Sequence, residues 1–114
     1  MARTETRFGA TNALGTTYTS LGTVPASTTW NVLLNATNRL TSVVKLRAYI
    51  ADTSWASGEP TGSTLVAAIA YDYPLGPGDV IQISGIVLAA TNKLIVWADT
   101  GSALDVIASG VAIT

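Results

Sequence analysis

Alternation of apolar and polar residues is the dominant pattern of the chain from residue 16 onward. Between Thr28 and Asn38 every second residue is apolar: Trp30, Val32, Leu34 and Ala36. The segment from Ser42 to Ala51 repeats this spacing with Val44, Leu46, Ala48 and Ile50. A period of two is typical of a strand with one buried face. Asn38-Arg39 predicts a tight turn, so we expect the two segments to form a hairpin whose core includes Trp30.

Further short strands are predicted along the rest of the chain, each bounded by Gly, Pro, Asn or Asp. They cover residues 16–24, 64–73, 80–85, 93–99 and 104–113, and residues 86–90 are apolar. No segment shows helical spacing, and Val, Ile and Thr are abundant, which suits a pleated sheet. The pattern predicts an all-β fold, an antiparallel β-sandwich of about seven to eight strands, either jelly-roll or immunoglobulin-like.

Two segments lack this periodicity. Residues 1–15 alternate charges with Thr and have no apolar face, so we expect an N-terminal arm preceding a sandwich domain of residues 16–114. The arm would be either a frayed end or a docking element. Residues 52–63 are rich in turn formers and predict the longest loop of the domain, which carries Trp55.

The last two predicted strands are apolar on both faces. One face must meet the sandwich core, and the other needs a second surface. We therefore expect self-association through a face built from Ile95, Trp97, Ile107, Val111 and Ile113. The alternative is that the N-terminal arm covers these residues.

Composition also favours a protein partner. Hydrophobic residues make up 48% of the 114 residues and charged residues only 11%, against about 25% charged in ordinary domains. Part of the surface is expected to be covered by another protein, unless Thr, Ser and Asn solvate it. The net charge of −1 and the lack of a basic block argue against nucleic acid. No apolar run is long enough to suggest a membrane helix, and the N-terminus has no signal-peptide pattern.

No catalytic chemistry is predicted. The chain has no His and no Cys, which removes the commonest general base, thiolate nucleophile and transition-metal ligands. Asp99 and Asp105 flank one turn and are the weak alternative for a Ca²⁺ site, but no loop has calcium-ligand spacing. We expect no enzyme activity, no cofactor and no metal.

Several motifs give the chain a family resemblance. A strand rich in Thr and Tyr leads into Leu21-Gly22-Thr23-Val24-Pro25-Ala26, and Tyr71-Asp72-Tyr73-Pro74-Leu75-Gly76-Pro77-Gly78-Asp79 follows later. The order of motifs over residues 16–114 resembles that of small virion proteins of tailed bacteriophages. The resemblance implies a β-sandwich that binds the assembled shell, often as a trimer, with the major capsid protein as partner. It also implies synthesis in the cytoplasm of a bacterial host and a final location in the virion.

The functional expectation is thus a capsid decoration, or cement, protein. The alternative is a tail, baseplate or fibre-associated module that binds a tail protein, a receptor or a carbohydrate, with Trp55 and Tyr49 as sugar platforms. A secreted lectin is a weaker alternative, because the signal peptide is missing. The residues expected to bind the partner are Arg3, Arg7, Phe8 and Trp55.

Overall fold

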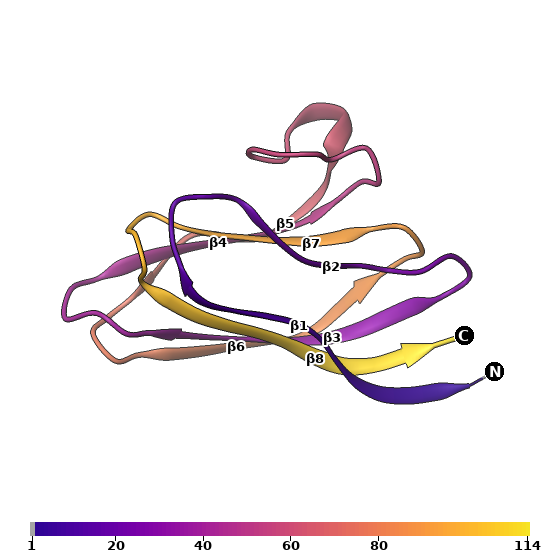
Figure 1. The fold of residues 1–114 in the computed structure, drawn as a ribbon, viewed down its shortest axis with the longest axis horizontal. Coiled ribbons are helices and arrows are strands. Elements are labelled where there is room, and N and C mark those ends of the chain that lie inside the picture. Colours follow the sequence, from indigo (N-terminus) through magenta and orange to yellow (C-terminus); the bar gives the residue numbers. More distant parts are fainter. Residues whose placement is uncertain (1) are drawn as a thin grey trace.

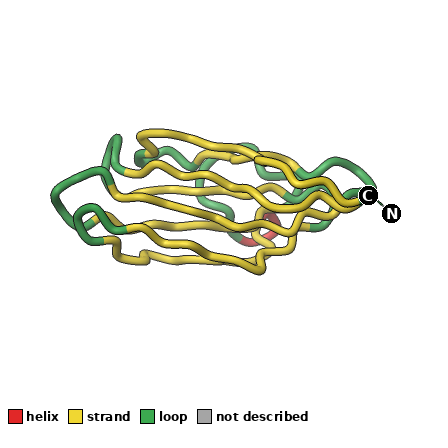
Figure 2. The backbone as a smooth tube through the Cα atoms, turned by 90° about the horizontal axis from the view of Figure 1, so that it is seen from below, coloured by secondary structure: helices red, strands yellow, loops and turns green. Residues whose placement is uncertain are grey.

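Two four-stranded antiparallel sheets, packed face to face, make up the computed structural model, which describes residues 2–114. The strands are β1 (Arg3–Leu14), β2 (Thr19–Thr23), β3 (Thr29–Asn38), β4 (Val44–Ala51), β5 (Leu65–Leu75), β6 (Val80–Leu88), β7 (Lys93–Ala98) and β8 (Leu104–Ile113). A single 3-10 turn, η1 (Gly62–Thr64), precedes β5. The strands run lengthwise through both layers (Figures 1 and 2). The predicted all-β sandwich is confirmed.

Strand pairing follows the order of a jelly roll. One sheet has the order β1-β8-β3-β6 and the other β2-β7-β4-β5. Every strand therefore pairs with its counterpart counted from the opposite end of the chain: β1 with β8, β2 with β7, β3 with β6 and β4 with β5. A long hairpin folded over on itself gives this arrangement, which decides between the two topologies left open by the sequence. The two ends of the chain lie side by side (Figure 1).

The hairpin predicted from residues 28–51 does not form, because β3 and β4 belong to different sheets. The buried side chain of Asn38, only 1% exposed, organises the crossing between them. Its Nδ2 group donates to the carbonyl oxygens of Ser42, Leu75 and Gly76 at 2.8 to 3.0 Å, and its Oδ1 accepts from the Leu40 amide. One amide thus satisfies the backbone groups of a corner, where the sequence predicted a simple turn.

The segment expected to be an arm is strand β1. It pairs with β8 from Arg3, opposite Ile113, to Leu14, opposite Leu104. Residues 3–7 are nevertheless exposed on both faces, so they leave no period-two signal in the sequence. The backbone hydrogen bonds to β8, rather than an apolar face, hold this half of the strand in place.

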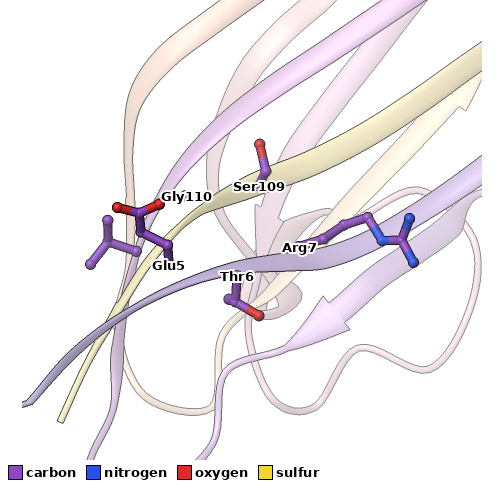
Figure 3. Close-up of a pocket in the computed structure, with 6 residues that line it drawn as sticks. Glu5, Thr6, Arg7, Ser109 and Gly110 are labelled. Atoms are coloured by element: carbon purple, nitrogen blue, oxygen red, sulfur yellow. The ribbon is translucent and has the colours of Figure 1, made fainter.

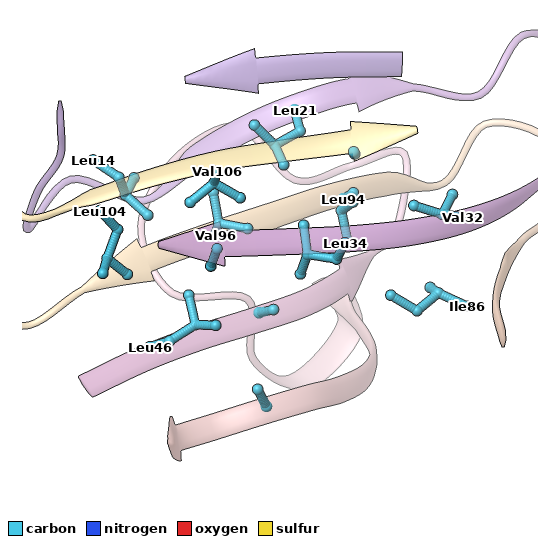
Figure 4. Close-up of a cluster of buried hydrophobic side chains, with 14 of the residues drawn as sticks. Leu14, Leu21, Val32, Leu34, Leu46, Ile86, Leu94, Val96, Leu104 and Val106 are labelled. Atoms are coloured by element: carbon cyan, nitrogen blue, oxygen red, sulfur yellow. The ribbon is translucent and has the colours of Figure 1, made fainter. Parts of the chain in front are cut away.

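The core lies between the sheets and is built from the inward residues of all eight strands and the loops beside them. Figure 4 shows Leu34 of β3 beside Leu94 of β7, with Leu46 of β4 further along the same core. All three are fully buried, and Trp30, 8% exposed, confirms its predicted place in the core. The short strand predicted over residues 80–85 continues to Leu88 as β6, with an irregularity between Ile83 and Ile86.

Candidate protein-binding surface

The two outer faces of the sandwich differ in how they are covered. Over the β2-β7-β4-β5 sheet, Tyr49, Ala51 and Ile95 form a second buried cluster. The loop of residues 52–63 rises from this side of the molecule (Figure 1) and brings Trp55 onto the cluster. The loop therefore covers the part of this face around Tyr49 and Ile95, while Tyr71 and Tyr73 of β5 remain exposed.

Two hydrogen bonds hold Trp55 in that position. Its indole Nε1 donates to the Gly58 carbonyl at 2.8 Å, and Lys93 Nζ donates to the Trp55 carbonyl at 2.9 Å. The Lys93 ammonium also lies 5.8 Å from the centre of the indole ring. The Trp55 side chain therefore shields the chain's own apolar cluster from solvent. Tyr49, the other proposed sugar platform, is only 2% exposed, so the structure does not support either ring as a free platform.

Arg47 lies at the centre of a charged and aromatic group on the same face. Its guanidinium donates to both carboxylate oxygens of Asp72, at 2.6 and 3.3 Å, and also to Glu59 and to the Tyr18 hydroxyl. The rings of Tyr71 and Trp97 lie 4.2 and 4.5 Å from the guanidinium carbon. The group ties the loop, through Glu59, to β5, through Asp72.

These contacts shift the protonation equilibria of the group. The hydrogen bond to Asp72 raises the pKa of Arg47, and the same bond lowers the pKa of Asp72. Burial, followed by the hydrogen bond that the Tyr49 hydroxyl donates to Glu59 at 2.6 Å, raises the pKa of Tyr49. The backbone at Asp72 has φ +53°, which is rare for a residue other than glycine. This bend lets Asp72 and its neighbour Tyr71 both contact Arg47.

The outer face of the β1-β8-β3-β6 sheet has no such cover from residues 2–114, since the loop lies on the far side of the molecule (Figure 1). Its apolar side chains come from β3, β6 and β8. Val87 is 58% exposed, Val80 56% and Ile107 36%, while Leu33 and Val111 are partly exposed.

Charge on this face is confined to its margin. Neither β3 nor β6 contains a charged residue. Arg3, Glu5 and Arg7 lie on the edge strand β1, and Asp105, near one end of β8, forms an exposed ion pair with Arg39. An apolar, hydrogen-bonding centre with a charged rim is the arrangement found at protein interfaces.

A shallow hollow marks the pairing of β1 with β8 at this rim. Glu5, Arg7, Ser109 and Gly110 line it, together with Thr6 and Val111. Figure 3 shows Arg7 extending along the strand away from Glu5. Glu5 and Arg7 place opposite charges on an open edge, where a polar partner surface can pair with them. Arg3 and Arg7, the two arginines expected to bind the partner, are both exposed.

The structure separates the residues predicted to form one self-association face. Ile95 and Trp97 belong to the β2-β7-β4-β5 sheet, where Ile95 is fully buried and Trp97 stacks on Tyr18 with centroids 5.5 Å apart. Residues 107, 111 and 113 lie on the outer face of the opposite sheet. These two sets cannot make a single contact surface.

Phe8, the fourth residue expected to bind the partner, faces the molecule itself. Its ring stacks on Trp30 with centroids 4.2 Å apart and planes inclined by 21°, and it packs against the core. Sequence reasoning missed Leu33, Val80 and Val87 as surface residues. The signal that could have found them is the absence of any charge from both β3 and β6.

Comparisons with protein-family models, with curated proteins and with solved structures give no match to the chain. Within residues 2–114, no group of three or more Asp or Glu side chains is placed to hold a metal ion. The same residues contain no helix of the length and apolarity needed to cross a membrane.

Proposed function

We propose that the chain is a structural protein of a bacteriophage virion, a capsid decoration protein that attaches to the assembled shell and stabilises it. The observation that carries the proposal is the uncovered outer face of the β1-β8-β3-β6 sheet. The resemblance of residues 16–114 to small phage virion proteins indicates the setting, which is a phage particle. In this setting the partner is the major capsid protein, and the chain works by contact, without chemistry of its own.

The dimensions of the face suit this role. The molecule measures 45 Å along its length and 18 Å across its narrowest direction, which is the width of the sheets (Figure 2). The projected area of the face is therefore at most about 800 Å², of the order of what each partner buries in a standard protein interface. Repetition over many copies would let a modest individual contact stabilise the shell.

Charge placement supports the same face. A partner subunit can cover β3 and β6 without burying an unpaired charge, because neither strand contains a charged residue. Arg3 and Arg7 remain at the rim, where exposed ion pairs with the shell would guide orientation and contribute little affinity. We therefore assign the binding energy to the apolar centre and the orientation to β1.

Two valines provide a matched test. Val87 lies on the proposed face and is 58% exposed, whereas Val66 lies on β5 of the other sheet and is 53% exposed. Particles purified from a phage that lacks the gene would be mixed with the recombinant chain, and occupancy measured by quantitative gel. Val87→Lys should weaken binding at least about tenfold, because the ammonium must be desolvated, and Val66→Lys should bind normally.

Particle heat stability gives the second readout. Decorated particles should release their genome at a higher temperature than undecorated ones, and Val87→Lys should abolish the difference. Equal occupancy for both variants would show that the shell does not contact this face. No binding by the unmodified chain at any concentration would refute the decoration role itself.

A further inference from the structure

The four edge strands of the sandwich are unequally protected against pairing with another chain. Folded proteins guard sheet edges with charges, prolines, bulges or short strands. β1 carries three charges, Arg3, Glu5 and Arg7, and its register against β8 shifts twice. β2 has only five residues. β5 contains Pro74, and its register against β4 shifts three times. Among residues 2–114, β6 is the long edge strand with neither charge nor proline; β2 also lacks both but is protected by its shortness.

The first half of β6 is a regular strand with a free edge. Val80 to Ile83 pair in unbroken register with β3, from Thr37 to Leu34. The register breaks only after this stretch, where Gly85 adopts φ +75°. β6 has no second neighbour in its sheet, so the backbone groups on its outer side have no strand partner.

Side chains along this edge alternate in a way that suits pairing. Ile81 and Ile83 point inward and pack against the core, yet both remain partly exposed because the sheet ends there. Gln82, between them, points outward and is exposed. A further strand at this edge would cover both isoleucines and continue the uncharged outer face.

We propose that β6 is the site of association with a second copy of this chain, through antiparallel pairing of the two β6 strands about Gln82. In this register Gln82 faces Gln82 of the second copy, and Ile81 faces the second copy's Ile83. The two sheets join into one of eight strands. A two-fold axis at Gln82 closes the assembly as a dimer.

A second copy fits this edge because the strand is complementary to itself. Opposed residues of antiparallel strands lie on the same face, so isoleucine meets isoleucine over the core and the two Gln82 amides can exchange hydrogen bonds. No like charges meet. The nearest charge, Asp79, would lie opposite Gly85, and its carboxylate already accepts from the Gly76 amide at 2.8 Å.

Charge substitution at Gln82 tests the register directly. The unmodified chain should be a dimer by light scattering and native mass spectrometry at about 100 μM. Gln82→Lys and Gln82→Glu should each be monomeric, because two like charges then oppose one another across the axis, and each should weaken association at least about tenfold. An equimolar mixture should form a heterodimer, since lysine now faces glutamate.

Asn31→Lys is the matched control. Asn31 is exposed on the same outer face but lies on β3, one strand inward from the edge, so this variant should remain dimeric. Circular dichroism of each variant would establish that it is folded. A monomeric unmodified chain, or a mixture that does not associate, would overturn the proposal. A trimer would overturn it too and would favour the sequence-based expectation. The test uses no virion, so its outcome is independent of shell binding.

Discussion

Replacing Phe8 with alanine should destabilise the folded protein rather than remove a docking contact. The Phe8 ring stacks on Trp30, 4.2 Å away between centroids, and is one of the side chains packed against the core. Phe→Ala at a fully buried site costs about 3–5 kcal/mol. Phe8 is partly exposed, so we expect a loss of about 2–3 kcal/mol, of which the aromatic pair contributes about 1 kcal/mol.

Urea unfolding followed by tryptophan fluorescence would measure this loss. For a domain of this size the melting temperature should fall by about 8–12 °C. Arg7→Ala is the matched control, because Arg7 is the exposed neighbour on the same strand, and it should change stability by less than about 0.5 kcal/mol. Unchanged stability of Phe8→Ala, combined with reduced occupancy on particles, would refute this reasoning. Phe8 would then contact the partner, as the sequence suggested.

Three further perturbations test other parts of the structure. Gly110→Ala should cost about 3 kcal/mol or more, since its Cβ would lie 2.0 Å from the Asn31 carbonyl oxygen at φ +149°; a normal urea midpoint would contradict the close approach of β8 to β3. Asp72→Asn should lower the urea midpoint at neutral pH but not in strong acid. The lowered pKa of Asp72 means that its pairing with Arg47 stabilises the fold above about pH 4 and is lost as the pH falls. An equal loss at both pH values would exclude a charge effect. Stability should also decline above about pH 10, where Tyr49 ionises in the unfolded chain but, with its raised pKa, stays neutral in the folded one. Tyr49→Phe should reduce that decline, and an unaltered alkaline profile would contradict it.

Local alternation predicted much of the fold correctly. The inward residues of β3, Trp30, Val32, Leu34 and Ala36, are all buried, because a strand turns successive side chains to opposite faces whatever its neighbours are. β1 was not predicted as a strand, because its first half lacks this alternation. Its first half is exposed on both sides and is held by backbone bonds, which every residue type except proline can make.

Which outward side chains are covered and which are exposed could not be predicted from the residues of one strand. Ile95 and Ile107 both alternate with core residues, yet Ile95 is covered by the loop of residues 52–63 and Ile107 lies open on the opposite sheet. The spacing of each strand predicts that it has two faces. The spacing does not show which sheet the strand joins, or which segment covers that sheet.

The class of fold and the core residues of β3 can be predicted from the sequence alone, because β-branched residues and a period of two act locally. The sequence also indicates that charge is scarce over most of the surface. Three other features become visible only in the folded molecule: β3 pairs with β8 and β6 rather than with β4, Arg47 contacts Asp72, and β6 is an unprotected edge of its sheet. Backbone hydrogen bonds are alike for almost all residues, so strand order follows from how the whole chain buries its apolar surface, and the exposed faces and edges follow from that order.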